Sequence, residues 1–176
     1  MNQLKNIEIT KIYHEDLNTL FELSNSTFRD TFAAQNTPEN LNKYLSDNFN
    51  KEKLEKELSN PNSFFYFAKR GGEIVAYLKI NIGDAQTESF EMRSIEIERI
   101  YVRKPFLGMK IGQTLLEFSK EIAHQQQANV IWLGVWEENY PAIAFYQKNG
   151  FQVFDRHVFV LGNDHQIDIL MKLNLD

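Results

Sequence analysis

The sequence predicts an α+β fold in which strands and helices surround one sheet with a parallel strand pair at its centre. Residues 129–136 (N-V-I-W-L-G-V-W) are near-continuously apolar, which is typical of a strand covered on both faces. A strand at residues 94–102 and then a helix precede this run, and a strand–helix–strand order implies a parallel, right-handed crossover. Turn residues at 70–73 (R-G-G-E) and 162–164 (G-N-D) indicate antiparallel hairpins on either side.

The first third of the chain predicts one strand and three helices. Residues 7–13 (I-E-I-T-K-I-Y) alternate and are rich in β-branched side chains, as expected for a strand. Asp16 can cap the next helix, whose apolar stripe continues as far as Phe32. A second helix follows Thr37, an N-cap residue placed before a proline. Residues 50–58 (N-K-E-K-L-E-K-E-L) indicate a third helix, whose charges we interpret as a solvated face.

The remaining elements complete the predicted sheet. An amphipathic helix begins at Ile111 and ends near residues 124–127, because apolar side chains recur at i, i+4, i+7 and i+11. A short helix at residues 141–148 ends before Gly150. Further strands at 63–69, 74–82, 151–161 and 166–173 bring the mostly antiparallel sheet to about seven strands.

Composition excludes several kinds of site. One domain is expected over residues 1–176, because this length is typical of a single globular domain. The chain has no cysteine, which excludes disulfides, a thiolate nucleophile and cysteine-ligated metal. No metal site is expected, because no ligand spacing relates the histidines, which are His14, His124, His157 and His165.

Net charge and hydropathy limit the classes of partner and the cellular locations that we expect. The net charge of −5 makes nucleic acid an unfavourable partner and suits a cationic substrate. No stretch resembles a signal peptide or approaches the roughly 20 apolar residues that cross a bilayer. We therefore expect a cytoplasmic protein without a membrane partner. Edge strands near the C-terminus could pair in a homodimer.

Two glutamates stand out in the strand at residues 94–102 (S-I-E-I-E-R-I-Y-V). Alternation places Glu96 and Glu98 on one face with Ile100 and Val102, and places Ile95, Ile97 and Tyr101 on the other. A carboxylate in so apolar a strand needs a partner or a raised pKa. Two interpretations stay open: a functional role, or a structural pairing with Arg99, Arg93 or Lys79.

The segment at residues 104–112 (K-P-F-L-G-M-K-I-G) is a turn-rich loop that opens into a helix. A helix N-terminus carries unpaired N–H groups and the positive end of the helix dipole, so this segment could bind an anion. Gly112 lets a ligand approach the backbone closely, and Lys110 adds a cation that would suit phosphate.

Three motifs together resemble the GNAT superfamily of N-acetyltransferases. They are I-E-R-I-Y-V (97–102), L-G-M-K-I-G-Q-T-L-L (107–116) and W-L-G-V-W-E-E-N-Y-P-A-I-A-F-Y-Q-K-N-G-F (132–151). The most specific part is residues 139–151, which match N-x-x-A-x-x-F-Y-x-K-x-G-F, and the resemblance spans residues 7–173. With T-F-R-D-T-F-A-A-Q-N-T-P-E-N-L-N-K-Y-L (27–45), the chain is also similar to the bacterial spermidine/spermine N-acetyltransferase group.

The resemblance implies acetyl-CoA as acetyl donor, a small amine as acceptor, and helices on both faces of the sheet. The phosphate-loop signature of the superfamily, Q/R-x-x-G-x-G/A, falls on residues 107–112, where Leu107 and Lys110 depart from it. The residues implied to bind acetyl-CoA are Ile100, Tyr101, Val102, Leu107, Gly108, Met109, Lys110, Ile111, Gly112, Gln113, Asn139, Ala142, Tyr146 and Lys148.

The resemblance also implies direct attack of the amine on the thioester in a ternary complex. Amides of residues 100–102 would stabilise the developing oxyanion, and Tyr146 would protonate the leaving thiolate. Glu98 or Glu96 would take the proton of the ammonium group and, with Phe28, bind a polyamine such as spermidine or spermine. Two alternatives stay open: another acceptor (a peptide N-terminus, an amino sugar or a small toxic amine), or a CoA-binding protein of this fold with weak or lost catalysis.

Overall fold

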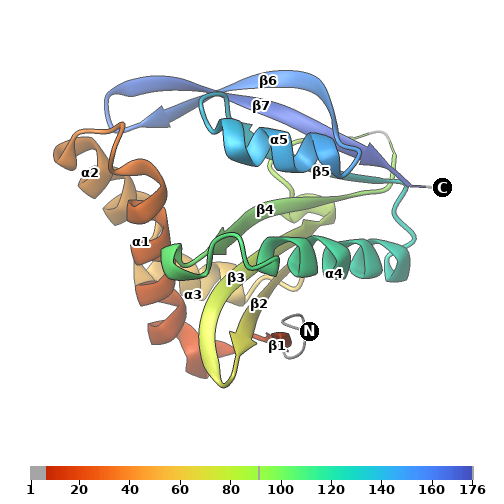
Figure 1. The fold of residues 1–176 in the computed structure, drawn as a ribbon, viewed down its shortest axis with the longest axis horizontal. Helices are drawn as coiled ribbons and strands as arrows, with labels where there is room; N and C mark the ends of the chain where they lie inside the picture. The colour runs from red at the N-terminus through yellow and green to blue at the C-terminus, as the bar shows by residue number, and fades with distance from the viewer. Residues whose placement is uncertain (1–6, 91, 176) are drawn as a thin grey trace.

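The computed structural model describes residues 7–90 and 92–175, whose strands form a seven-stranded sheet of order β1-β2-β3-β4-β5-β7-β6 (Figure 1). The strands are β1 (Ile7–Lys11), β2 (Ser63–Arg70), β3 (Glu73–Ile82), β4 (Ser94–Val102), β5 (Val130–Trp136), β6 (Gln152–Leu161) and β7 (Asp164–Asn174). The α-helices are α1 (Leu17–Phe32), α2 (Pro38–Asn48), α3 (Lys51–Leu58), α4 (Ile111–Gln125) and α5 (Tyr140–Lys148). Only β4 and β5 pair in parallel within the described ranges, which confirms the predicted mixed sheet.

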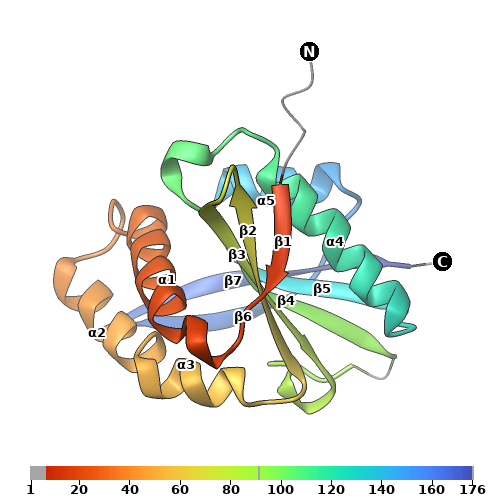
Figure 2. The same ribbon diagram turned by 90° about the horizontal axis from the view of Figure 1, so that it is seen from below.

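Helices cover both faces of the sheet, as predicted. Figure 2 shows α1 and α3 on one side of the β1–β4 strands and α4 on the other. On the α1–α3 side, Leu20 and Leu54 pack with Tyr77 of β3 in one buried cluster. On the opposite side, Ile111 of α4 packs with apolar residues of β3 and β4, and α5 joins this cluster through Tyr146. Burial of one such aliphatic side chain contributes about 1.5–3 kcal/mol, so the two clusters hold the helices to the sheet.

Strands β4 and β5 pair only where they begin. Their parallel ladder joins residues 94–96 to residues 130–132. Beyond it, β5 continues along β7 as far as the Trp136–Asp168 pair, and β4 continues along β3. Figure 1 shows the two strands diverging. Within the part of the chain that the structure describes, the facing edges of β4 and β5 therefore lack a strand partner over their second halves.

A β-bulge in β4 changes which side chains share a face. Its ladder with β3 pairs Arg99 with Lys79 and then Ile97 with Ile80, so Glu98 is the extra residue. Glu96 and Glu98 share a face, as expected. For residues 100–102 the predicted faces are wrong. The prediction assumed strict alternation of side chains along β4, and the extra residue at the bulge shifts this alternation by one position. The residues that change sides are Tyr101, which packs with Tyr77, and Ile100 and Val102, which pack with Ile95 and Ile97.

Local capping explains two of the three helix starts predicted in the first third of the chain. Thr37 Oγ1 accepts a hydrogen bond from Asn40 N at 3.3 Å, and Asn50 Oδ1 accepts one from Lys53 N at 2.8 Å. Asp16 precedes α1, but its carboxylate accepts from Tyr13 N at 3.0 Å instead of from a helix amide, so this predicted cap is wrong.

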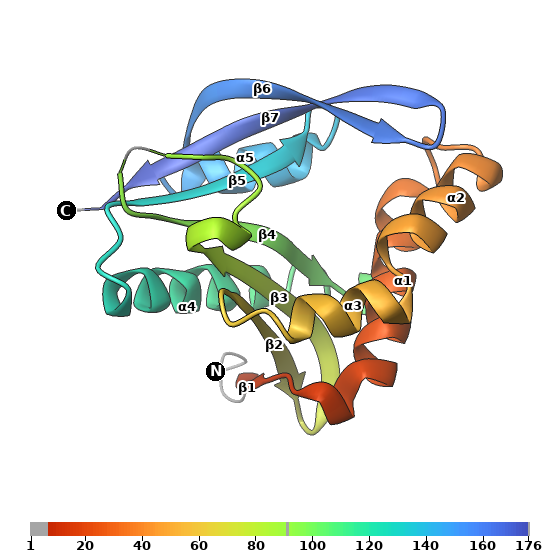
Figure 3. The ribbon, with the colours of Figure 1, turned by 180° about the vertical axis from the view of Figure 1, so that it is seen from behind.

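The β6–β7 hairpin reaches across to the N-terminal helices. Figure 3 shows the end of this hairpin beside α2. Asn163 N donates to Asn40 Oδ1 at 3.2 Å, and Gln166 Nε2 donates to Asn36 Oδ1 at 2.9 Å. These contacts close one side of the space above the diverging strands. No helix of residues 7–90 and 92–175 combines the length and the apolarity of a membrane span.

Candidate active site

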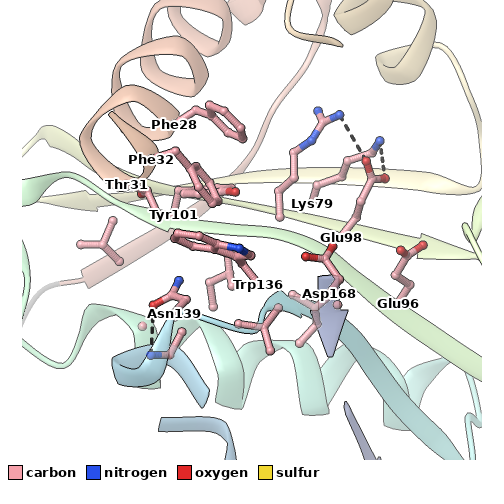
Figure 4. Close-up of a pocket in the computed structure, with 18 of the residues that line it drawn as sticks. Phe28, Thr31, Phe32, Lys79, Glu96, Glu98, Tyr101, Trp136, Asn139 and Asp168 are labelled. Atoms are coloured by element: carbon pink, nitrogen blue, oxygen red, sulfur yellow. Dashed lines mark hydrogen bonds and ion pairs between the residues drawn. The ribbon is translucent and has the colours of Figure 1, made fainter. Parts of the chain in front are cut away.

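A cavity of about 1900 Å³ lies where β4 and β5 diverge (Figure 4). Its walls come from β4 and β5, from α1, α2 and α3, from the β6–β7 hairpin, and from the loops that open α4 and α5. Every residue that the sequence placed in the site lines this cavity except Met109. Met109 is exposed instead, with its sulfur 2.8 Å from Arg70 Nη1.

The free edge of β4 presents two backbone N–H groups to the divergence. Arg103 N donates to Val75 O at 2.8 Å, and this bond sets the alternation of the β3–β4 ladder. The N–H of Tyr101 therefore faces β3, whereas those of Ile100 and Val102 face the side from which β5 has diverged. Of the three amides expected to meet an acyl group, two are aimed at the cavity and that of Tyr101 is not.

The loop before α4 has the backbone shape of a glycine at Lys110. This residue lies in the left-handed region, with φ 61° and ψ 13°, and Gly108 has φ 78°. Left-handed backbone costs a residue with a side chain about 1–2 kcal/mol, which a glycine avoids. The side chains of Lys110 and Leu107 are exposed, so they leave the turn open.

The first turn of α4 offers backbone donors beside this loop. Its first intrahelical bond joins Thr114 N to Lys110 O at 3.0 Å, so the N–H groups of Ile111, Gly112 and Gln113 precede the hydrogen-bonded part of the helix. The side chain of Gln113 is already engaged, because it donates to Asn149 Oδ1 at 2.8 Å. This first turn therefore offers an anion its backbone N–H groups, beside the Lys110 ammonium of the preceding loop.

Helix α5 brings an amide group and a phenol to the same cavity. Asn139 Oδ1 caps the helix by accepting from Ala142 N at 3.3 Å, which leaves the Asn139 NH₂ group to face the cavity. Tyr146 is buried between Phe145 and Phe151, and burial raises its pKa. Its hydroxyl is therefore protonated at neutral pH and can donate a proton. Lys148 is exposed at the end of α5.

Four charged side chains form a closed ion network on the β4 wall. Glu57 of α3 lies 3.1 Å from Lys79 Nζ and 2.7 Å from Arg99 Nη1, and Glu98 contacts the same cations at 2.5 and 3.2 Å. Burial raises the pKa of Glu98, but the Arg99 and Lys79 charges outweigh it and lower this pKa to about 2. Glu98 thus has the structural pairing that the sequence left open, and it is a weak proton acceptor.

Glu96 lies on the same wall in a different environment. It is 3% exposed and accepts hydrogen bonds from Thr87 N at 2.9 Å, from Thr87 Oγ1 at 2.6 Å and from Asn81 Nδ2 at 3.0 Å. Burial raises its pKa more than these bonds lower it. Within the described ranges, no lysine or arginine forms an ion pair with Glu96.

Sequence reasoning missed two partly buried acidic residues of the cavity, Asp168 and Glu57. Asp168 of β7 points into it (Figure 4), and burial raises its pKa to about 6, with His157 opposing. Its I-D-I context carries the same signal that singled out Glu96, a carboxyl in an apolar strand, and could have identified it. Glu57 was interpreted as part of a solvated face, which is wrong. The spacing of charges along the helix did not indicate that Glu57 is partly buried, because it becomes so only when α3 docks on the sheet.

The ring of Phe28, which the resemblance places at the substrate, belongs to the core as well as to the cavity wall. Phe28 is 2% exposed and stacks on Tyr44, with 4.9 Å between the ring centroids, so it belongs to a buried cluster. The same ring lines the cavity. In the part of the chain that the structure describes, no group of three or more His, Cys, Asp or Glu side chains could hold a metal ion.

Residues 17–151 match the acetyltransferase (GNAT) family. The chain belongs to this family. It is 43% identical over 166 residues to an uncharacterized N-acetyltransferase in the pepI 3′ region of Lactobacillus delbrueckii subsp. lactis, with 94% of this chain and 96% of the relative covered. It is 29% identical over 153 residues to the spermidine N(1)-acetyltransferase of Thermoplasma acidophilum, with 85% and 90% covered.

A solved GNAT structure has the same fold. The crystal structure of PaiA N-acetyltransferase from Thermoplasma acidophilum in complex with coenzyme A matches with a TM-score of 0.78 at 26% identity, covering 97% of this chain and 99% of that one. The predicted superfamily is thereby confirmed, and with it an acetyltransferase whose co-substrate is acetyl-CoA. The residues present fit this coenzyme, since the unpaired amides of α4 and the Lys110 ammonium suit an anion.

Proposed function

We propose that this GNAT acetyltransferase transfers the acetyl group of acetyl-CoA to a primary amine of a polyamine such as spermidine or spermine. The observation that carries the proposal is a pair of cavity carboxyls, Glu96 and Asp168, that form no ion pair with a lysine or arginine of residues 7–90 and 92–175. The charges of Glu57 and Glu98 are already balanced by two cations. A substrate with several ammonium groups would supply the missing partners, and the similarity to a spermidine N(1)-acetyltransferase supports this class.

The donor half of the cavity is assigned to acetyl-CoA, which supplies the acetyl group as a thioester. Backbone N–H groups of Ile111, Gly112 and Gln113, together with the Lys110 ammonium, would hold the pyrophosphate. The remaining assigned residues would shape the loop or contact the arm of the coenzyme; they are Leu107, Gly108, Met109, Asn139, Ala142 and Lys148.

The diverging edge of β4 and the phenol of α5 would serve the reaction. Attack by a neutral amine forms the C–N bond and places negative charge on the carbonyl oxygen, which the N–H groups of Ile100 and Val102 would stabilise. As the C–S bond breaks, Tyr146 gives its proton to the sulfur and recovers one from the attacking nitrogen through solvent. An amine that binds as ammonium must also lose one further proton.

The two glutamates of β4 take different parts on the acceptor side. Glu98 is held by Lys79 and Arg99, so its part is to keep the wall in place. Glu96 forms no ion pair with a lysine or arginine among the described residues, and it would bind a second ammonium group of a polyamine. The ring of Phe28 would contact the methylene chain between these groups.

Thiol release from acetyl-CoA with spermidine, spermine, butylamine and a peptide with an N-terminal alanine tests the proposal. We expect kcat/KM for spermidine to exceed that for butylamine on the order of tenfold, the effect of one charge-assisted hydrogen bond. Glu96→Gln should remove most of this difference by raising KM for spermidine. The matched control is Glu121→Gln, an exposed site on α4.

Two results would contradict the proposal in different ways. A preference for butylamine or the peptide would favour acetylation of another amine. Calorimetric binding of acetyl-CoA without thiol release for any amine would favour a CoA-binding protein without catalysis. A homodimer formed through the edge strand β6 and a cytoplasmic location stay predictions, and light scattering after size-exclusion chromatography tests the first.

A further inference from the structure

Asp168 lies at the place where the sheet opens (Figure 4). Its backbone pairs with Trp136 at the end of β5 and with His157 of β6. A Cβ added to Gly134 of β5 would lie 3.5 Å from Asp168 Oδ2. Gly134 comes two residues after Trp132, the last residue of β5 that pairs with β4. The carboxylate of Asp168 therefore lies over the first part of β5 that has lost its parallel neighbour.

Among the residues that the structure describes, the titratable groups around Asp168 form no hydrogen bond or ion pair with its oxygens. They are His157 on β6, Tyr44 on α2, and Glu98 and Arg99 on β4, all of which line the same cavity, while its β5 neighbours Gly134 and Trp136 do not titrate. Arg99 is engaged by Glu57 and Glu98. The pKa of Asp168 is raised by burial and lowered by His157, and no hydrogen bond from the described residues changes it.

We propose that Asp168 is the proton acceptor for the reacting amine: its carboxylate binds the ammonium group where β4 and β5 diverge and removes the proton that blocks the nitrogen lone pair. This inference rests on the proposed function, because it requires an amine as acceptor. The N–H bond breaks and an O–H bond forms on Asp168, while the nitrogen keeps the electron pair that then makes the C–N bond.

His157 offers the proton a way out. It stands directly opposite Asp168 in the β6–β7 ladder, and cross-strand neighbours of this kind have Cβ atoms about 5 Å apart. Its side chain is 56% exposed, and its Nδ1 lies 3.1 Å from Glu88 Oε1 at the surface. An imidazole in this position can pass the proton from the half-buried carboxyl to water.

The other cavity carboxyls of the β4 wall are less suited to this step. Glu98 is saturated by two cations, and its pKa of about 2 makes it a weak base. Both oxygens of Glu96 accept hydrogen bonds from Thr87. Burial raises the pKa of Asp168 to about 6, which leaves the group ionised at neutral pH and close to the value that proton transfer favours.

The test measures thiol release over a range from about pH 5 to about pH 9 with saturating acetyl-CoA. It compares the unmodified protein, Asp168→Asn and the matched control Asp155→Asn, an exposed site on β6. Spermidine is the acceptor, or whichever amine of the panel the unmodified protein turns over best. Calorimetry with acetyl-CoA checks that each variant is folded and binds the donor with unchanged affinity and stoichiometry.

We expect kcat/KM of the unmodified protein to rise through about pH 6, where Asp168 ionises, and then to level off. Asp168→Asn should be lower on the order of 10²-fold at neutral pH, mainly in kcat. Its residual rate should climb about tenfold per pH unit, because only the neutral fraction of the amine reacts. Asp155→Asn should keep the full rate and the unmodified profile.

Three outcomes would overturn the inference. An unchanged pH profile in Asp168→Asn removes the proton-acceptor role while the proposed function stands. A change in KM alone reduces Asp168 to a binding residue. An unmodified protein that acetylates no amine overturns both this inference and the proposed function.

Discussion

The two ends of the cavity are built from different kinds of chemical group. The donor end consists mainly of backbone N–H groups, those of Ile111, Gly112 and Gln113 in α4 and those of Ile100 and Val102 in β4, with the Lys110 ammonium beside them. The acceptor end consists of side-chain carboxyls on two facing walls. A backbone donor does not depend on its own side chain, so the loop before α4 keeps its turn with Leu107 and Lys110 in place of the residues of the family signature.

The pKa of a carboxyl depends on every neighbouring group, and two carboxyls of the acceptor end show how large this dependence is. Glu98 and Asp168 share one cavity, yet Arg99 and Lys79 lower the pKa of one to about 2 and burial raises the pKa of the other to about 6. Substitutions at the acceptor end should therefore have large effects whose sign follows the local charge. Substitutions in the donor loop should have small ones.

The largest effect is expected for Glu98→Gln, which leaves Lys79 and Arg99 with one carboxylate between them. The free energy of unfolding should fall by about 3 kcal/mol at neutral pH. Because the pKa of Glu98 in the folded state lies below its ordinary 4.5, its stabilisation is complete above about pH 4.5 and is lost as the pH falls through about 2. Urea unfolding at both ends of this range measures the loss.

The matched control is Glu55→Gln, an exposed glutamate on α3. Its unfolding free energy should change by less than about 0.5 kcal/mol. Equal losses in the two variants would mean that the network around Glu98 does not stabilise the fold.

The next effect is expected for Tyr146→Phe, between the two ends. Turnover should fall on the order of 10²-fold, because the leaving thiolate loses its proton donor, while acetyl-CoA affinity stays within about twofold. Thiol release and calorimetry measure the two quantities. Tyr140→Phe, at an exposed tyrosine on the same helix, is the control, and unchanged turnover in Tyr146→Phe would remove Tyr146 as the acid.

Asp168→Asn should change stability in the direction opposite to Glu98→Gln. Burial raises the pKa of Asp168 from 3.8 to about 6, so folding disfavours its ionised form, and the wild type loses stability as the pH rises through about 6. Asparagine escapes this loss. The variant should be more stable by about 1 kcal/mol above that pH, a value reduced for partial exposure, and no more stable at about pH 4. Thermal unfolding at the two pH values, with Asp155→Asn as control, decides it.

The smallest effect is expected in the donor loop. Lys110→Gly relieves the left-handed strain and should raise the unfolding free energy by up to about 1 kcal/mol. Lys110→Ala keeps the strain and removes only the ammonium group. Comparing the two variants therefore separates the effect of backbone strain from the effect of the lost charge. Acetyl-CoA affinity should fall by less than about tenfold in both, and a greater loss would mean that the donor end depends on this side chain after all.

Local patterns were enough to predict much of this protein. Hydrophobic periodicity and turn residues predicted the seven strands, the parallel pair and most helix bounds, because these depend on neighbours within a few residues. Thr37 and Asn50 cap their helices through amides three residues away. The dense motif at residues 139–151 indicated the family for the same reason, since one short helix carries both Asn139 and Tyr146.

Local patterns could not predict the acceptor end, because it is assembled from segments that are distant in the sequence. Glu57 meets Lys79 and Arg99 only because α3 docks on the sheet, and the bulge at Glu98 depends on the register between β3 and β4. Asp168 reaches the cavity only because β7 pairs beside β5. The amino-acid sequence alone thus set the elements, the family and the residue types of the site. Burial and charge pairing, which exist only once distant strands and helices meet, decided which carboxyl is neutralised and which is free.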